Sequence, residues 1–105
     1  MNESQVTTAL AALSQQTRLR ILRYLVTQGP AGATAGDIGK KVEASSSRAS
    51  FHLAALTQAD LITATRRSRH IIYAVDFTAM GALIGYLVKD CCNNNAQVVA
   101  CCATP

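Results

Sequence analysis

The sequence lacks the features that build a disulfide-stapled or membrane-spanning protein. No cysteine occurs in the first 90 of its 105 residues, Trp is absent, and only 5% of the residues are aromatic. A secreted disulfide framework spreads its cysteines through the fold, so this core must form without such bridges. The longest apolar run, 80–88, is far shorter than the ~20 residues that span a bilayer, and no leader segment is recognisable at the N-terminus. We therefore expect a soluble, cytoplasmic protein with no membrane partner.

Charged residues are also scarce, at 15%, but their distribution is uneven. Nine of the ten Lys and Arg residues lie between positions 14 and 75, where only three of the six acids occur. Half of the residues are hydrophobic, which indicates an ordered chain with a single core. A positive surface in the middle of the chain favours a polyanionic partner. A solvated basic face with no partner would explain the charge alone equally well.

Apolar periodicity and turn residues predict five helices and one hairpin in residues 1–90. The helices are expected over roughly 6–13, 14–28, 34–43, 46–59 and 76–88, with N-caps at Ser14, Thr34, Ser45 or Ser46, and Asp76. Two β-branched runs, 61–65 and 70–75, flank a basic tip and predict two strands. We expect a mainly α winged helix-turn-helix domain over 1–90, followed by a flexible, cysteine-bearing tail over 91–105.

A short helix, a tight turn, a helix with a polar start and a basic hairpin follow one another in the order of a helix-turn-helix with a wing. Base edges in the major groove are read by hydrogen bonds, and arginine can bind guanine through two of them. Hairpin arginines can contact phosphates or the minor groove. The predicted contacts to double-stranded DNA are Ser46, Ser47, Arg48, Ser50, His52, Arg66, Arg67 and Arg69. Plainer alternatives stay open: helix capping for Ser45 and Ser46, an internal hydrogen bond for His52, and a solvated hairpin tip for Arg66, Arg67 and Arg69.

The last predicted helix, 76–88, has an apolar face with few charges and three small residues that permit close packing. Such a face is too apolar for the surface of a monomer, which favours a homodimer interface. Packing of this helix on the core of its own chain is the alternative.

Three stretches resemble the ArsR/SmtB family of metal-sensing repressors. They read TRLRIL at 17–22, SFHLAAL at 50–56 and RRSRHIIY at 66–73, and the resemblance extends over about 5–90. It implies a homodimeric winged-helix repressor whose first and last helices form the dimer interface. It also implies that binding of a metal or metalloid releases operator DNA.

Two sensing sites common in that family lack their ligands in this sequence. Many members carry a cysteine motif where the helix-turn-helix begins, but residues 34–39 contain no cysteine. Zinc-sensing members offer Asp and His ligands on the last helix, and here Asp76 is followed by no histidine. The only clustered soft ligands are the two adjacent pairs at the end of the chain.

Those pairs are Cys91–Cys92 and Cys101–Cys102. Soft thiolates select soft ions, and trivalent arsenic or antimony takes three of them in a pyramid. We expect arsenite or antimonite as the inducer, held by Cys91, Cys92 and either Cys101 or Cys102. A thiophilic metal ion bound through all four sulfurs, a redox-dependent disulfide between the pairs, and a tail without function stay open as alternatives.

An enzyme is not expected. The sequence has no Cys-x-x-Cys motif, no phosphate-cradling loop behind a cysteine, and no histidine close in sequence that would activate a thiolate. A storage protein that uses only the cysteines would not need the nine basic residues between 14 and 75. The sequence therefore predicts a repressor with a DNA-reading surface and a separate thiol site.

Overall fold

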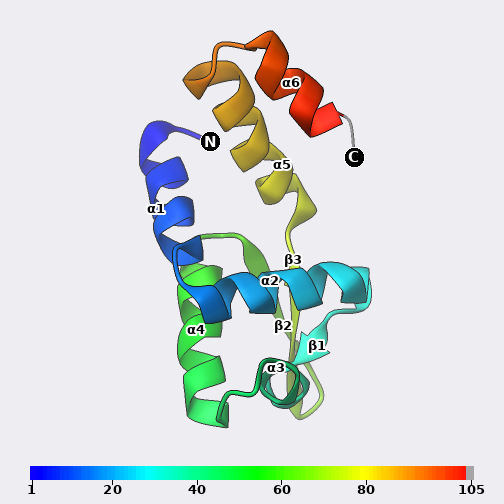
Figure 1. Ribbon diagram of the computed structural model, residues 1–105. Helices are drawn as coiled ribbons and strands as arrows, with labels where there is room; N and C mark the ends of the chain where they lie inside the picture. Colours follow the sequence, from blue (N-terminus) through cyan, green and yellow to red (C-terminus); the bar gives the residue numbers. More distant parts are fainter. Residues whose placement is uncertain (104–105) are drawn as a thin grey trace.

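A computed structural model describes residues 1–103. It contains six α-helices and a three-stranded antiparallel sheet (Figure 1), whereas the sequence predicted five helices and two strands. The elements follow in the order α1 (Glu3–Leu13), α2 (Gln16–Gln28), β1 (Ala33–Thr34), α3 (Ala35–Val42), α4 (Ser46–Gln58), β2 (Ile62–Arg67), β3 (His70–Val75), α5 (Phe77–Tyr86) and α6 (Ala96–Ala103). A 3₁₀ turn (Gly29–Ala31) ends α2, and a π-helical turn (Leu87–Cys91) extends α5.

Three predicted N-caps are confirmed. Side-chain oxygens of Thr34, Ser45 and Asp76 accept hydrogen bonds from the backbone N–H groups three residues further on, at 3.2, 3.3 and 3.0 Å. Each cap therefore satisfies one of the N–H groups that a helix start leaves without an internal partner.

The N-cap predicted at Ser14 is wrong. Gln15 occupies that position, and its Oε1 accepts the N–H of Arg18 at 2.9 Å. Only two residues separate α1 from α2. Ser14 is used instead to end α1, where its hydroxyl donates to the carbonyl of Ala11 at 3.0 Å.

The sheet gains a strand that the sequence did not reveal. β1 pairs with β3 through Ala33 and Thr34, which lie opposite Tyr73 and Ile72. Two residues are too few for an alternating pattern to show. The close approach of β1 to β3 also requires glycine at position 32. The φ of Gly32 is +64°, and a Cβ there would overlap the carbonyl of Tyr73.

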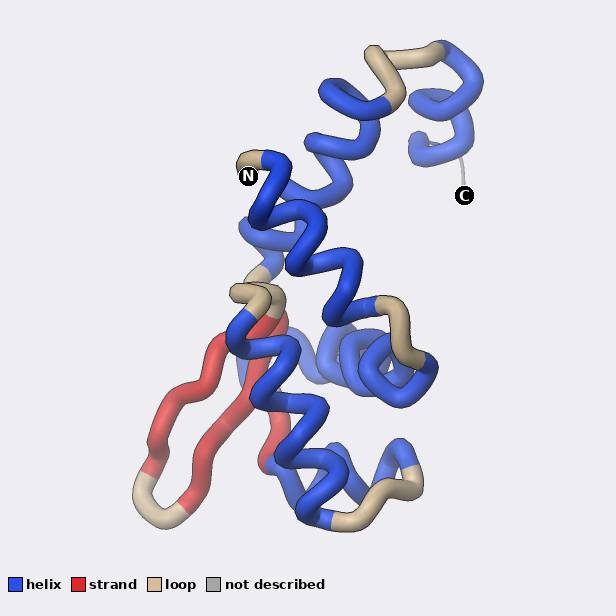
Figure 2. Tube along the Cα trace, turned by 90° about the vertical axis from the view of Figure 1, so that its left-hand side faces the viewer, coloured by secondary structure: helices blue, strands red, loops and turns tan. Residues whose placement is uncertain are grey.

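The core lies where α2, α3 and α4 meet the sheet. Its largest fully buried side chains are Ile21, Leu25, Ile38, Leu53, Leu56 and Leu61. In Figure 2 the hairpin of β2 and β3 stands beside α4, so this core fixes the helix-turn-helix and the wing against each other.

Helix α5 leaves most of its apolar face uncovered. Only Leu83 of this helix is buried, whereas Phe77 and Ile84 are about half exposed, and Leu10 of the neighbouring α1 is also exposed. A second copy of the chain could cover this face. Among the described residues, none of the helices combines the length and the apolar character needed to cross a bilayer.

Helix α6 occupies a segment that the sequence predicted to be flexible. Asn93 and Asn94 take the left-handed conformation, with φ of 50° and 54°, which asparagine tolerates better than most residues. The chain therefore reverses, and Asn95 caps α6 by accepting the N–H of Gln97 at 3.0 Å. In Figures 1 and 2 α6 turns back beside the end of α5.

Candidate functional site

Helices α3 and α4 form the predicted helix-turn-helix. Glu43 closes α3 in the left-handed conformation, and the chain enters α4 two residues later at the cap Ser45. The two helices can approach because Gly39 has no side chain. A Cβ at Gly39 would lie 2.9 Å from the carbonyl oxygen of Ala44 and 3.6 Å from the Cβ of Ala49.

The outer side of the first turns of α4 is polar and open to solvent. Ser46, Ser47, Arg48 and Ser50 are all exposed. Ser45 is committed to capping, since its Oγ accepts the N–H of Arg48 and lies 3.4 Å from the Oγ of Ser47. The structure therefore leaves four of the five predicted residues on this helix free to meet DNA.

His52 is the exception, and its predicted DNA-facing position is corrected. The side chain is only 7% exposed, and its Nδ1 accepts a hydrogen bond from the Nε–H of Arg18 at 3.1 Å. Burial, then the positive charges of Arg18 and Arg48, lower the pKa of His52 below its usual value. A neutral imidazole with an acceptor Nδ1 fits this contact. His52 thus joins α4 to α2 rather than facing outward.

The sequence reasoning overlooked Phe51 on the same helix. Its side chain is 66% exposed, and the guanidinium carbon of Arg18 lies 5.7 Å from the ring centroid. The predicted DNA contacts were all hydrogen-bonding side chains, and Phe51 was given no role of its own. Its position one turn after the exposed Ser47 was the available signal.

The wing presents the three predicted arginines. Strands β2 and β3 pair as far as Arg67 and His70, leaving a two-residue loop of Ser68 and Arg69. Arg66, Arg67 and Arg69 are exposed. In Figure 2 the loop lies at the same end of the molecule as the start of α4, so both can reach one DNA duplex.

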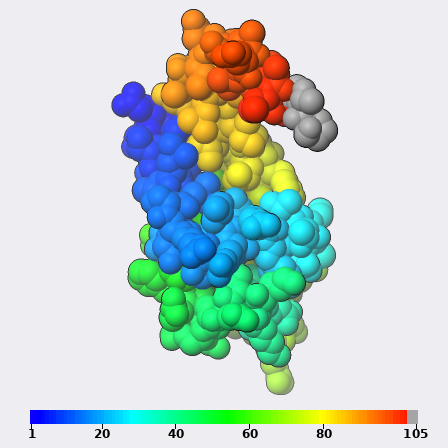
Figure 3. Space-filling model, in the orientation of Figure 1, coloured from blue at the N-terminus to red at the C-terminus, as the bar shows by residue number. Residues whose placement is uncertain are grey.

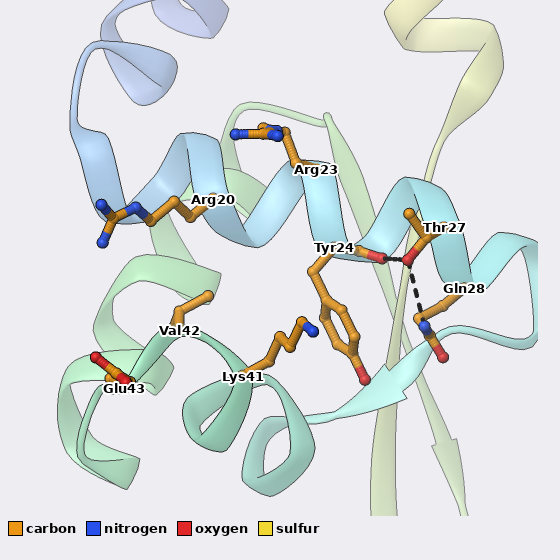
Figure 4. A pocket seen from close by; sticks show the side chains of 8 residues that line it. All are labelled: Arg20, Arg23, Tyr24, Thr27, Gln28, Lys41, Val42 and Glu43. Atoms are coloured by element: carbon orange, nitrogen blue, oxygen red, sulfur yellow. Dashed lines mark hydrogen bonds between the residues drawn. The ribbon is translucent and has the colours of Figure 1, made fainter.

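Other basic residues line a cleft between α2 and α3 with a volume of about 500 Å³ (Figure 4). Arg20, Arg23 and Lys41 lie along it, and the Lys41 Nζ is 6.0 Å from the ring centroid of Tyr24. In Figure 4 the side chain of Arg23 points away from α3. The basic segment 14–75 is therefore divided between the end formed by α4 and the wing and this flank, a division that charge counting could not show.

The four thiols lie at the opposite end of the molecule from the wing (Figures 1 and 3), along a longest dimension of 47 Å. Cys92 is half-buried, and the other three cysteines are exposed. Burial raises the pKa of the Cys92 thiol, with further contributions from the charge of Cys91, a hydrogen bond to Cys91 and the charge of Cys102. Of the second pair, Cys102 is thus the cysteine whose charge acts on Cys92.

Thiol proximity does not amount to a formed metal site. Within residues 1–103, no three His, Cys, Asp or Glu side chains are grouped closely enough to hold a metal ion. Binding through three sulfurs would require the end of α5 and α6 to close together.

Known proteins resemble both the sequence and the fold. Residues 13–64 match the family described as a helix-turn-helix domain. The HTH-type transcriptional regulator YgaV of Escherichia coli (strain K12) is 33% identical over 88 residues, which cover 84% of this chain and 87% of YgaV.

Several solved structures of transcriptional regulators have a similar fold. The homodimeric winged helix-turn-helix DNA-binding domain Mb0332 from Mycobacterium bovis superposes with a TM-score of 0.65 at 27% identity, covering 83% of this chain and 81% of that one. Reduced HlyU from Vibrio cholerae N16961 gives 0.66 at 26% identity, covering 84% and 90%. The ArsR-like transcriptional regulator from Rhodococcus sp. RHA1 has a TM-score of 0.75 over 92% and 89% of the chains, and at 24% identity it supports the fold alone.

Fold, wing and polar recognition helix together define a winged-helix DNA-binding protein. The chain belongs to the HTH-type transcriptional regulators, and it shares the winged-helix fold of Mb0332, which is described as a possible ArsR-family regulator.

Proposed function

We propose that this regulator is a homodimeric repressor that leaves its operator when arsenite or antimonite binds the thiolates of Cys91, Cys92 and Cys102. The observation that carries the proposal is the position of Cys91, Cys92 and Cys102 at one end of the molecule, where Cys91 and Cys102 also contribute to raising the pKa of Cys92. These residues come from two different helical segments, and the reversal at Asn93 and Asn94 brings them to one end of the molecule. Three sulfurs are the number that a pyramidal metalloid takes.

The raised pKa of Cys92 favours a metalloid over a divalent cation. A cation must displace the proton of every thiol that it binds, so a raised pKa weakens its binding as pH falls. Arsenous acid carries three hydroxyl groups, and each leaves as water with the proton of one thiol. Three S–H and three As–O bonds break while three As–S bonds form, with no oxidant and no net release of protons.

Repression is proposed to require a dimer. The exposed apolar residues Leu10, Phe77 and Ile84 on α1 and α5 offer a surface for a second copy, and Mb0332 is described as homodimeric. Two recognition helices would then read half-sites about one helical turn apart, roughly 34–36 Å. Because the thiols follow α5 directly, closing them around a metalloid would move the helix that sets this spacing.

The test uses an operator selected from random-sequence DNA by the protein itself. In reducing buffer, arsenite is expected to weaken binding of this operator by about 5–150-fold, the range of typical allosteric couplings. The Cys91→Ser/Cys92→Ser and Cys102→Ser variants should bind the operator normally without responding. Cys101→Ser is the matched control and should respond like the wild type.

Unchanged affinity in the presence of arsenite would refute the sensing proposal. The redox alternative predicts release by a thiol oxidant with no effect of arsenite. The divalent-metal alternative predicts release by zinc or cadmium that weakens between pH 8 and pH 6, whereas arsenite release should change little over that range.

A further inference from the structure

We infer that Phe51 reads the 5-methyl group of a thymine in the major groove of the operator. The inference rests on the DNA binding of this family and on the geometry of α4, and not on the thiol chemistry. Phe51 is the most exposed of the large hydrophobic side chains in the described chain, at 66%. An exposed aromatic side chain on the helix that faces DNA is available for an apolar contact with the base edges.

The helix geometry directs Phe51 outward. Helix α4 buries Ala49, His52, Leu53 and Leu56 on its inner side. At 100° per residue, Phe51 projects nearly opposite the centre of this buried face. It lies one turn after Ser47, in the part of the helix whose exposed side chains are otherwise polar.

The ring of Phe51 is held in place by Arg18 of α2 and by its own neighbour on α4, His52. The guanidinium carbon of Arg18 lies 5.7 Å from the ring centroid, and the imidazole of His52 meets the ring edge-on at 5.6 Å with an angle of 70° between the planes. Arg18 is itself fixed by its hydrogen bond to His52. An aromatic side chain ordered before binding loses less conformational entropy when it meets DNA.

The chemical groups in the major groove determine which base Phe51 can contact. A phenyl ring offers no hydrogen bond, and among the bases only thymine presents a methyl group in the major groove. Neighbouring Ser47, Arg48 and Ser50 remain exposed for the hydrogen bonds that other bases need. Phe51 would thus supply the apolar part of a readout that is otherwise polar.

The experiment removes single methyl groups from the DNA. Operator duplexes selected by the wild-type protein are resynthesised with deoxyuridine in place of each thymine in turn. At one thymine per half-site, loss of the methyl group should weaken DNA binding by the wild-type protein about fourfold. This corresponds to about 0.8 kcal/mol for one buried carbon. Phe51→Ala should bind the two duplexes equally.

Val26→Ala is the matched control, because Val26 is an exposed apolar residue of α2, 47% exposed. This variant should keep the wild-type preference for the methyl group. If Phe51→Ala binds too weakly to measure, Phe51→Leu replaces it and should retain a smaller preference. Circular dichroism melting verifies that each variant is folded.

Three outcomes would overturn the inference: no thymine responds to loss of its methyl group, the response persists in Phe51→Ala, or the protein selects no preferred sequence. None of these measurements contains arsenite. Failure of the metalloid proposal would therefore leave the assignment of Phe51 intact, and failure of this assignment would leave metalloid release intact.

Discussion

Replacing Arg67 of the wing by alanine should lower the salt dependence of DNA binding by a calculable amount. The wing exposes Arg66, Arg67 and Arg69 at the end that carries α4. Six phosphate contacts in a dimer give a slope of log K against log salt of about −5.4, because each contact contributes about −0.9. Arg67→Ala removes two contacts and should change the slope to about −3.5.

The assay is fluorescence anisotropy of labelled operator at salt concentrations between 50 and 200 mM. Over this range the wild type should lose affinity by about 10³-fold and the variant by about 10²-fold. Arg23→Ala is the matched control, since it removes the same charge from the cleft shown in Figure 4. Equal slopes for the two variants would refute the placement of the wing on DNA, because net charge alone would then explain the salt dependence.

Two further predictions concern stability. Because the pKa of His52 is lowered, protonation favours the unfolded chain, so the stability that neutral His52 contributes is present above its usual value of 6.5 and is lost as pH falls below it. The free energy of unfolding in urea should fall less between pH 7.5 and pH 5.5 for His52→Asn than for the wild type, because asparagine keeps an acceptor for Arg18 and does not titrate. An identical fall in both proteins would contradict this prediction. Gly32→Ala should destabilise by more than 1 kcal/mol in the same assay, because its φ is positive and its Cβ would overlap the Tyr73 carbonyl. Gly36→Ala, inside α3, places its Cβ in ordinary contact with the Thr34 Oγ1 at 3.9 Å and should be neutral or stabilising by up to about 1 kcal/mol; similar losses at both glycines would argue against the β1–β3 contact.

Much of the fold could be predicted because its signals are local. The caps at Thr34, Ser45 and Asp76 satisfy donors only three residues away, and β-branched residues mark both strands of the wing. Strand β1 could not be found in this way, because its two residues become a strand only when β3 lies beside them.

The site was harder to predict where a side chain's direction depends on a distant element. His52 is polar and follows exposed residues on α4, yet Arg18, 34 positions earlier in the chain, holds it inside. The same arginine lies over the ring of Phe51, an exposed aromatic side chain that the predicted DNA contacts did not include. Residue chemistry alone therefore placed His52 on the DNA-facing surface and gave no role to its exposed neighbour Phe51.

The separation of the thiols from the wing along the 47 Å axis has a consequence for how such a regulator can diversify. Substitutions beyond α5 touch neither the recognition helix nor the core that holds it. On the proposed function, exchange of the π-helical turn and α6 would change the chemical signal that is sensed, while the DNA-binding domain and its set of target genes stay the same. Exchanging these segments between relatives with the same winged-helix domain would show whether the inducer can be changed without changing the operator.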